Sequence, residues 1–300
     1  MTNLINKFDL NYISYKIDEP MCNHTSFKTG GKASLFVPID SEEKLCRVLE
    51  LCKEENKDVF ILGKGSNLLV SDEGISDRVV IHISTDFADM KLLDDTTIEV
   101  SAGASLASLC KFALANSLSG LEFAYGIPGS CGGAVYMNAG AYGGEMKDVV
   151  VSVNHIDKNG NKGTFRGDEL KFAYRKSAYT DSGLVITSLV LKLEKGDKIA
   201  IEAIMTETMG KRVDKQPLEY PSAGSVFKRP EGYFAGALIE QSGLKGKRIG
   251  GAMVSEKHAG FIINYDKATT TDILDLIKYC QDTVYNNFGV RLETEIKFVL

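Results

Sequence analysis

The stretch that decides the fold is G-I-P-G-S-C-G-G-A-V-Y-M-N-A-G-A-Y-G-G-E, residues 126–145 of a chain of 300 residues. A second glycine-rich stretch, G-K-G-S-N-L-L-V at 63–70, follows the apolar segment V-F-I-L, which is typical of a short buried strand. Glycines allow main-chain N–H groups to approach phosphate oxygens, and successive amides can form an anion-binding nest. Either stretch alone is equally compatible with simple tight turns, but the two together favour a long phosphate-bearing ligand.

Neither stretch has the form of a familiar nucleotide-binding motif. Both lack the pattern G-x-x-x-x-G-K-[ST], and neither is a G-x-G-x-x-G between a strand and a helix. The sequence therefore supports neither an ATP-binding P-loop nor an ordinary Rossmann dinucleotide site.

The composition is that of a globular protein, with 44% hydrophobic and 25% charged residues. A net charge of -5 leaves no basic stripe for a nucleic-acid backbone. No apolar run approaches the ~20 residues of a membrane span, and the first ten residues resemble no secretory signal. We therefore expect a cytoplasmic protein that acts on a small molecule, without nucleic-acid or membrane partners.

The cysteines and histidines do not predict a metal site. Six cysteines are scattered without C-x-x-C spacing, and the four histidines lie far apart in the sequence. The cysteines are expected to be reduced and to pack mostly as small hydrophobic side chains.

Hydrophobic periodicity predicts a mixture of helices and strands. Leu45, Val48, Leu49 and Cys52 share one helical face behind Ser41, a plausible N-cap. Further helices are predicted near 105–117, 200–211, 233–244 and 270–287, and strands near 59–62, 79–83, 97–104, 149–156 and 184–193.

The closing run R-L-E-T-E-I-K-F-V-L, at 291–300, alternates apolar and charged residues. This pattern predicts a half-buried strand with Leu292, Thr294, Ile296 and Phe298 on one face.

Six motifs in order along nearly the whole chain resemble those of the UDP-N-acetylenolpyruvoylglucosamine reductases, flavoenzymes of peptidoglycan precursor synthesis. They are N-H-T-S-F-K-T-G-G, L-G-x-G-S-N-L-L-V, residues 126–145, Y-R-K-S, P-S-A-G-S-V-F-K and L-E-T-E-I. Only K-S-A-Y-T-D-S-G separates Arg175 from the next predicted strand, so the chain resembles the short form that lacks an inserted tyrosine loop.

The resemblance implies an α+β protein with an FAD-binding fold of the vanillyl-alcohol oxidase type and a carboxyl-terminal α+β substrate domain. The implied division is an FAD-binding subdomain at 1–78 with 289–300, a second at 79–207, and a substrate-binding domain at 208–288. The implied contacts with non-covalent FAD are Gly63, Lys64, Gly65, Ser66, Asn67, Gly126, Ile127, Pro128, Gly129, Ser130, Gly132, Gly133, Asn138, Gly140 and Ile186.

The implied activity is NADPH-dependent reduction of UDP-N-acetyl-3-O-(1-carboxyvinyl)-glucosamine to UDP-N-acetylmuramate by a cytoplasmic monomer, with hydride passing from NADPH through FAD to the substrate. The implied catalytic residues are Arg175, which binds the substrate carboxylate, Glu295, which helps to polarise it, and Ser225, which protonates the intermediate. The implied substrate-binding residues are Tyr174, Lys215, Lys228 and Arg229. Arg229 replaces an asparagine that is common in the family, so its contact departs from the family pattern.

Ser225 has other interpretations when P-S-A-G-S-V-F-K is considered alone. A serine after glycine commonly opens a helix, so Ser225 is also a plausible N-cap. A nucleophilic role is poorly supported, because the second glycine of a G-x-S-x-G elbow and a local histidine are both missing.

Two other functions remain open at this stage. One is an FAD-linked oxidase of the same fold, which would lack the set of Arg175, Ser225 and Glu295 and would often carry covalent flavin. The other is a non-catalytic module that binds flavin or a UDP-sugar.

Overall fold

The computed structural model describes residues 2–300, which divide into two compact units. The first contains residues 2–16, Leu35–Lys64 and Asp77–Lys211, and the second contains Ile17–Ser34, Gly65–Ser76 and Arg212–Leu300. The chain crosses between them after Lys16, after Ser34, after Lys64, after Ser76 and after Lys211. The three-part division expected from the family stays a prediction.

A four-stranded sheet has the order β1-β2-β5-β3, in which β2, β5 and β3 are parallel. Its strands are β1 (Lys16–Pro20), β2 (Lys32–Ile39), β5 (Val79–Ile83) and β3 (Val59–Leu62). Helix α2 (Glu42–Glu54) connects β2 to β3, and the hydroxyl oxygen of Ser41 accepts a hydrogen bond from Lys44 N–H. The predicted N-cap and the predicted buried face of this helix are therefore confirmed.

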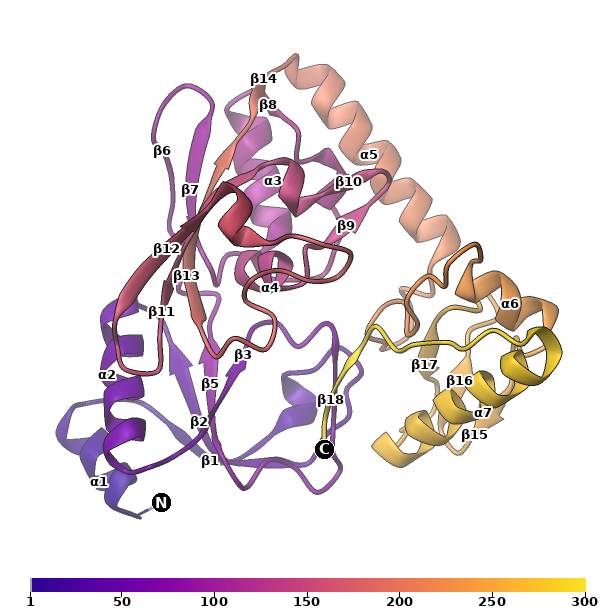
Figure 1. Cartoon of the computed structure of the whole chain (residues 1–300), viewed down its shortest axis with the longest axis horizontal. Helices are drawn as coiled ribbons and strands as arrows, with labels where there is room; N and C mark the ends of the chain where they lie inside the picture. The colour runs from indigo at the N-terminus through magenta and orange to yellow at the C-terminus, as the bar shows by residue number, and fades with distance from the viewer. Residues whose placement is uncertain (1) are drawn as a thin grey trace. The chain divides into compact units, whose positions relative to one another are not determined.

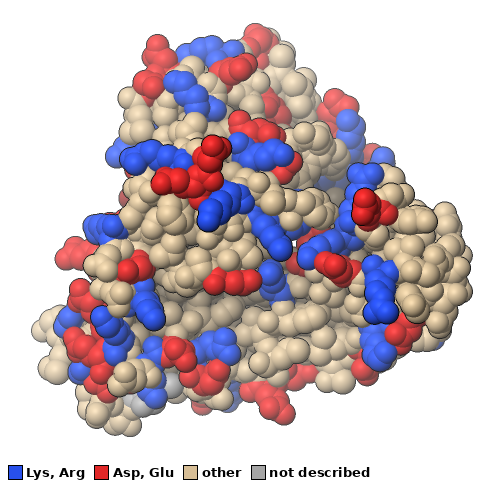
Figure 2. Space-filling view, viewed as in Figure 1, with Lys and Arg blue, Asp and Glu red and all other residues tan. Residues whose placement is uncertain are grey.

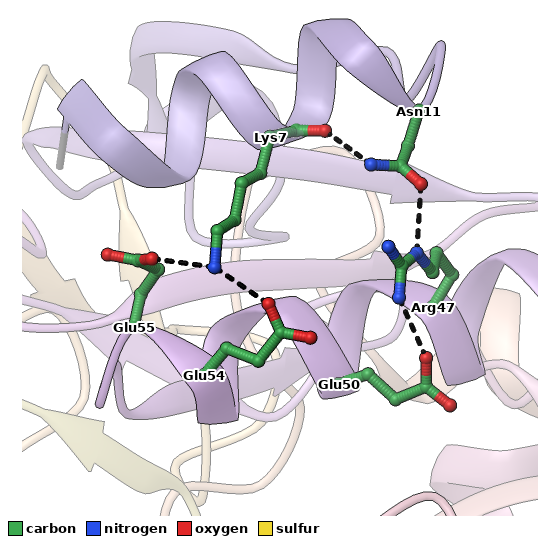
Figure 3. Close-up of polar contacts among 6 residues, drawn as sticks. All are labelled: Lys7, Asn11, Arg47, Glu50, Glu54 and Glu55. Atoms are coloured by element: carbon green, nitrogen blue, oxygen red, sulfur yellow. Dashed lines mark hydrogen bonds and ion pairs between the residues drawn. The ribbon is translucent and has the colours of Figure 1, made fainter.

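Helix α1 (Thr2–Leu10) was not predicted from the sequence. Its buried residues are Leu4 and Phe8, with Ile5 partly buried beside them, and this pattern is too short to separate a helix from a polar loop. Polar contacts with α2 surround this face: Lys7 Nζ lies 2.7 Å from Glu54 and 2.8 Å from Glu55 (Figure 3). Arg47 of α2 donates hydrogen bonds to Asn11, which follows α1, and to Glu50 (Figure 3).

The larger sheet of the first unit is antiparallel, with the order β12-β11-β13-β7-β6. Its strands are β12 (Lys162–Arg166), β11 (Val150–Ile156), β13 (Val185–Lys192), β7 (Thr97–Ser101) and β6 (Met90–Leu92). Helices α3 (Leu106–Ala115) and α4 (Cys131–Tyr136) accompany it (Figure 1). Two ribbons complete the unit's strands: β8 (Leu118–Ser119) with β14 (Glu194–Lys195), and β9 (Gly140–Ala141) with β10 (Gly144–Glu145).

The second unit contains a small antiparallel sheet, β15-β16-β17, packed against helix α7 (Figure 1). Its elements are β15 (Arg248–Ile249), β16 (Ala252–Val254), β17 (Ile262–Asn264), α6 (Ala235–Gln241) and α7 (Thr270–Phe288). Helix α5 (Lys198–Lys215) leads into this unit and is longer than predicted. Residues 2–300 also contain four short 3-10 helices: η1 (Met21–Asn23), η2 (Glu122–Ala124), η3 (Met146–Asp148) and η4 (Gly167–Leu170).

The prediction for the closing run was partly wrong. Only β18 (Lys297–Val299) is a regular strand, and it pairs in parallel with β4 (Leu68–Val70). Phe298 is 40% exposed, whereas Val299 is buried. The alternation fails because residues 293–295 pair with 226–228 instead, and the chain changes partner at Ile296.

Basic and acidic side chains are interleaved on the face that Figure 2 presents. Among residues 2–300, no helix combines the length and the apolar character of a membrane span.

Asp72 caps helix α7 from outside the helix. Its two carboxylate oxygens accept hydrogen bonds from Thr270 N–H at 3.0 and 2.8 Å. Thr269 and Asp272 form a capping box at the same end. Because Asp72 follows β4, this cap fixes α7 to the strand that pairs with β18.

We predict that Asp72→Ala lowers the free energy of unfolding by about 0.5–2 kcal/mol, because an N-terminal amide loses its acceptor and a negative charge leaves the helix start. Urea titration of the variant measures this loss. Glu73→Ala, in the adjacent exposed position, is the control and should have little effect. Equal stability of the two variants would contradict the capping role.

Candidate active site

The two glycine-rich loops predicted to bind FAD meet within the first unit. A Cβ added at Gly63, directly after β3, would lie 2.7 Å from Ser130 Oγ. Ser130 Oγ itself accepts a hydrogen bond from Gly133 N–H at the start of α4. The first loop therefore passes the second so closely that a side chain at Gly63 would displace the Ser130 hydroxyl.

Other glycines of residues 126–145 serve packing. Gly132 N–H donates to Ala102 O at 2.9 Å, and a Cβ at Gly132 would lie 2.9 Å from Ala102 Cβ. A Cβ at Gly140 would lie 2.7 Å from Gly144 O within the β9–β10 ribbon. Cys131 is fully buried, and burial raises the pKa of its thiol, so it is a packing residue.

The first loop continues into the second unit at Gly65. Gly65 has φ 60°, and a Cβ there would lie 2.0 Å from His24 O, so no other residue fits. Next to it, Asn67 O accepts a hydrogen bond from Lys297 N–H at 2.9 Å. Asn67 Nδ2 donates to Glu295 O at 3.2 Å. The end of this loop is thus joined to the segment that carries Glu295.

Ser225 and Glu295 lie on neighbouring segments of the second unit. Val226 N–H donates to Gly260 O at 2.9 Å, and Val226 O accepts from Glu295 N–H at 2.7 Å. Residues 225–228 therefore form a central segment between 260–261 and 293–295. Ser225 and Glu295 are 70 positions apart in the sequence. Ser225 is bonded covalently to Val226, and Glu295 is hydrogen-bonded to it.

The Ser225 side chain has a hydroxyl that donates to Phe227 O at 3.2 Å. The interpretation of Ser225 as an N-cap was wrong, because its backbone pairs with Phe261 and the next helix, α6, begins at Ala235. Main-chain hydrogen bonds to residues 260–261 and 293–295 hold this backbone extended. These partners are distant in sequence, so the residues around Ser225 do not reveal them.

Arg175 belongs to the first unit, in a two-residue turn. Ala173 and Lys176 close the turn with two main-chain hydrogen bonds of 3.0 and 3.1 Å. Arg175 has φ 58°, a left-handed conformation that is unfavourable for residues with a Cβ. Its guanidinium carbon lies 4.9 Å from the centre of the Tyr174 ring.

Asn138 holds this turn in place. Its side chain is fully buried; Nδ2 donates to Glu145 Oε2 at 2.5 Å and to Ala173 O at 3.1 Å. Oδ1 accepts from Lys147 N–H at 2.9 Å. All three bonds end on protein groups, so the side chain connects the β9–β10 ribbon to the Arg175 turn. Its expected contact with FAD stays a prediction.

The remaining predicted residues are divided between the units. In the first, Tyr174 is 51% exposed and Ile186 is buried in β13. In the second, Lys228 Nζ lies 3.1 Å from Glu293, and the Arg229 guanidinium lies 4.0 Å from the Phe234 ring centre. Lys215 is exposed at the end of α5. No cluster of three or more His, Cys, Asp or Glu within 2–300 is arranged to hold a metal ion.

Comparison with known proteins decides the family. Residues 216–299 match the family model "UDP-N-acetylenolpyruvoylglucosamine reductase, C-terminal domain", and residues 33–163 match "FAD binding domain". The UDP-N-acetylenolpyruvoylglucosamine reductase of Alkaliphilus oremlandii is 50% identical over 283 residues, covering 94% of this chain and 92% of the relative. The chain belongs to the UDP-N-acetylenolpyruvoylglucosamine reductase family.

Solved structures agree with this assignment. The UDP-N-acetylenolpyruvylglucosamine reductase of Thermus caldophilus has 35% identity and a TM-score of 0.80, and the match covers 96% of this chain and 99% of that one. Berberine bridge enzyme from Eschscholzia californica has 17% identity and a TM-score of 0.51 over 65% of this chain and 44% of its own, which is a likeness of fold alone. The predicted α+β, vanillyl-alcohol oxidase type of fold is confirmed.

Residues 33–163 match an FAD-binding domain, and the two glycine-rich loops of the first unit are compatible with FAD as the cofactor. At Gly63 and at Ser130 the two loops approach each other without an intervening side chain, which leaves main-chain amides and a hydroxyl as the available groups. Main-chain N–H groups and hydroxyls donate hydrogen bonds, and the oxygens of a pyrophosphate accept them. β13 begins at Val185, so residues 176–184 alone follow Arg175, as expected for the short form.

We predict that Gly63→Ala weakens FAD binding about tenfold or more, because the added methyl, 2.7 Å from Ser130 Oγ, must displace that hydroxyl from Gly133 N–H or move the two loops apart, at about 1–3 kcal/mol. Titration of the apoprotein with FAD measures this. Apart from the residues bonded to Gly63, only Ser130 atoms among residues 2–300 lie within 4 Å of the added Cβ, so Ser130 is the residue that must move.

The matched control is Gly210→Ala on α5, where an added Cβ meets no atom within 4 Å. That variant should bind FAD normally. Normal FAD affinity in Gly63→Ala would show that the close approach of the two loops is unimportant for the cofactor.

Proposed function

We infer that this protein is an oxidoreductase that reduces the enolpyruvyl ether of UDP-N-acetylglucosamine to UDP-N-acetylmuramate, with FAD as cofactor, in peptidoglycan precursor synthesis. The family membership supports the activity. The observation that carries the mechanism is the pairing through Val226, which puts Ser225 and Glu295 on adjacent segments.

The chemistry defines what the side chains must do. When bound, FAD supplies the hydride carrier, and we propose NADPH as the reductant. Hydride addition to the methylene carbon leaves negative charge on the neighbouring carbon and its carboxylate, and the protein must stabilise that charge.

We assign binding of the carboxylate to Arg175. A guanidinium can hold both oxygens of a carboxylate in one plane, which fixes the direction of the substrate as well as its charge. The turn closed by Ala173 and Lys176, together with the Asn138 bond to Ala173 O, limits the movement of the arginine backbone. A strained left-handed residue that is fixed in this way is typical of functional positions.

We assign protonation of the intermediate carbon to Ser225. A hydroxyl is a weak acid, but an enolate is a strong enough base for a well-placed weak donor. The bond from Ser225 Oγ to Phe227 O is 3.2 Å long, so rotation of the hydroxyl toward a substrate atom loses little. Glu295, held at Val226 O by its own amide, is assigned to polarise the carboxylate.

The outer parts of the substrate are assigned by charge. Lys215, Lys228 and Arg229 supply cations of the second unit for the diphosphate and nucleotide, and Tyr174 supplies a half-exposed ring beside Arg175. We further propose that the enzyme works as a cytoplasmic monomer.

The deciding experiment is an anaerobic flavin absorbance trace of the FAD-loaded protein. NADPH is added first and UDP-N-acetylglucosamine enolpyruvate second. Bleaching followed by recovery of the yellow band supports the proposed reaction. Bleaching without recovery would contradict the substrate, and no bleaching would favour a binding module. Flavin that remains on the acid-precipitated protein would favour the oxidase.

We predict that Ser225→Ala leaves flavin reduction by NADPH nearly unchanged and slows reoxidation by the enolpyruvyl substrate by about 100-fold or more, the usual scale for a lost general acid. Stopped-flow absorbance separates the two steps. Ser222→Ala, three residues earlier in the same segment, is the control. A similar loss in both steps would rule out the assigned role.

A further inference from the structure

We propose that His258 is a positioning residue for Ser225, acting through Gly260; this inference rests on the proposed function and adds a residue to its site. His258 Nδ1 accepts a hydrogen bond from Gly260 N–H at 3.1 Å. Gly260 O in turn accepts from Val226 N–H at 2.9 Å, and Val226 O accepts from Glu295 N–H at 2.7 Å. One chain of hydrogen bonds thus leads from the imidazole to both catalytic segments.

The imidazole and the Ser225 hydroxyl both lie near Gly260. A Cβ added at Gly260 would lie 3.0 Å from His258 Cε1 and 3.5 Å from Ser225 Oγ. The ring and the hydroxyl therefore both approach the same glycine, where a side chain would press on the ring. Phe261, whose backbone pairs with Ser225, contacts the ring edge to face, with centres 4.9 Å apart.

The turn around His258 is closed on itself. The buried Ser255 Oγ accepts from His258 N–H at 3.2 Å, and Phe261 N–H donates to His258 O at 2.9 Å. Ser255 N–H donates to Phe261 O at 2.9 Å. From the other side, a Cβ at Gly236 of α6 would lie 3.3 Å from His258 Cε1. The ring is therefore held in one orientation by packing and by hydrogen bonds.

The hydrogen bond also fixes the tautomer. Nδ1 accepts from Gly260, so the proton of the neutral ring is on Nε2. Burial lowers the pKa of His258, which keeps the ring neutral near pH 7. A neutral ring in this state has no acceptor left for the Ser225 proton. His258 therefore acts on the position of Ser225 and is not its base.

The test compares acceptor and non-acceptor side chains at 258. His258→Phe keeps an aromatic ring next to Phe261 and removes the acceptor, which leaves Gly260 N–H without its bond. His258→Asn places Oδ1 near the position of Nδ1 and can accept that bond. His258→Gln keeps a polar side chain but places its acceptor oxygen further from the backbone than Nδ1. It replaces the phenylalanine variant in the test if that variant does not fold.

We expect His258→Phe and His258→Gln to slow flavin reoxidation by the enolpyruvyl substrate about tenfold or more, because a small displacement of a reacting group is costly. Flavin reduction by NADPH should stay within about twofold, and His258→Asn should be close to wild type. Amide hydrogen exchange in residues 224–228 of the substrate-free protein should rise in His258→Phe and not in His258→Asn.

His155→Phe is the matched control. His155 is a buried histidine of the first unit, and its Nδ1 is 2.9 Å from the Tyr179 hydroxyl. That variant should lose stability without a selective loss of reoxidation.

Three results would overturn the inference: normal reoxidation in both His258→Phe and His258→Gln, equal slowing of both flavin steps, or an asparagine variant as slow as phenylalanine. Failure of the wild type to be reoxidised would overturn the proposed function, and this inference with it.

Discussion

The two hydrogen bonds of Val226 are the constraint on which the site depends. Its N–H binds Gly260 O and its C=O binds Glu295 N–H, so three segments distant in sequence form one layer. Main-chain bonds of this kind are directional and nearly independent of side-chain identity. They set the spacing of Ser225 and Glu295 more firmly than contacts between the two side chains could.

The first unit applies the same principle to Arg175. A turn with left-handed backbone at the arginine is closed by its neighbours and held at Ala173 O by a buried asparagine amide. Tyr136 O also accepts hydrogen bonds from the hydroxyls of Ser177 and Thr180, which follow the turn. The same glycine-rich segment that meets Gly63 therefore also holds the turn that carries Arg175.

Sequence reasoning succeeded where signals are local. Ser41 and the apolar face behind it predicted α2, because a cap and a helical face lie within a few residues of one another. The helix expected at 270–287 is α7. It missed α1, whose buried face is two residues, and misjudged Phe298, whose environment depends on a change of partner strand. His258 carried no local signal, since its role depends on Gly260 and Val226.

The bond between Asn67 and Glu295 joins positions 228 residues apart. During synthesis, the first loop and β4 leave the ribosome long before their partners in β18 exist, so the chain must keep an open strand edge in solution for most of its translation. Forming this contact lowers the conformational entropy of the chain, because it closes a long loop between distant parts of the sequence. The segment that carries Glu295 reaches the first loop only when this long-range contact closes.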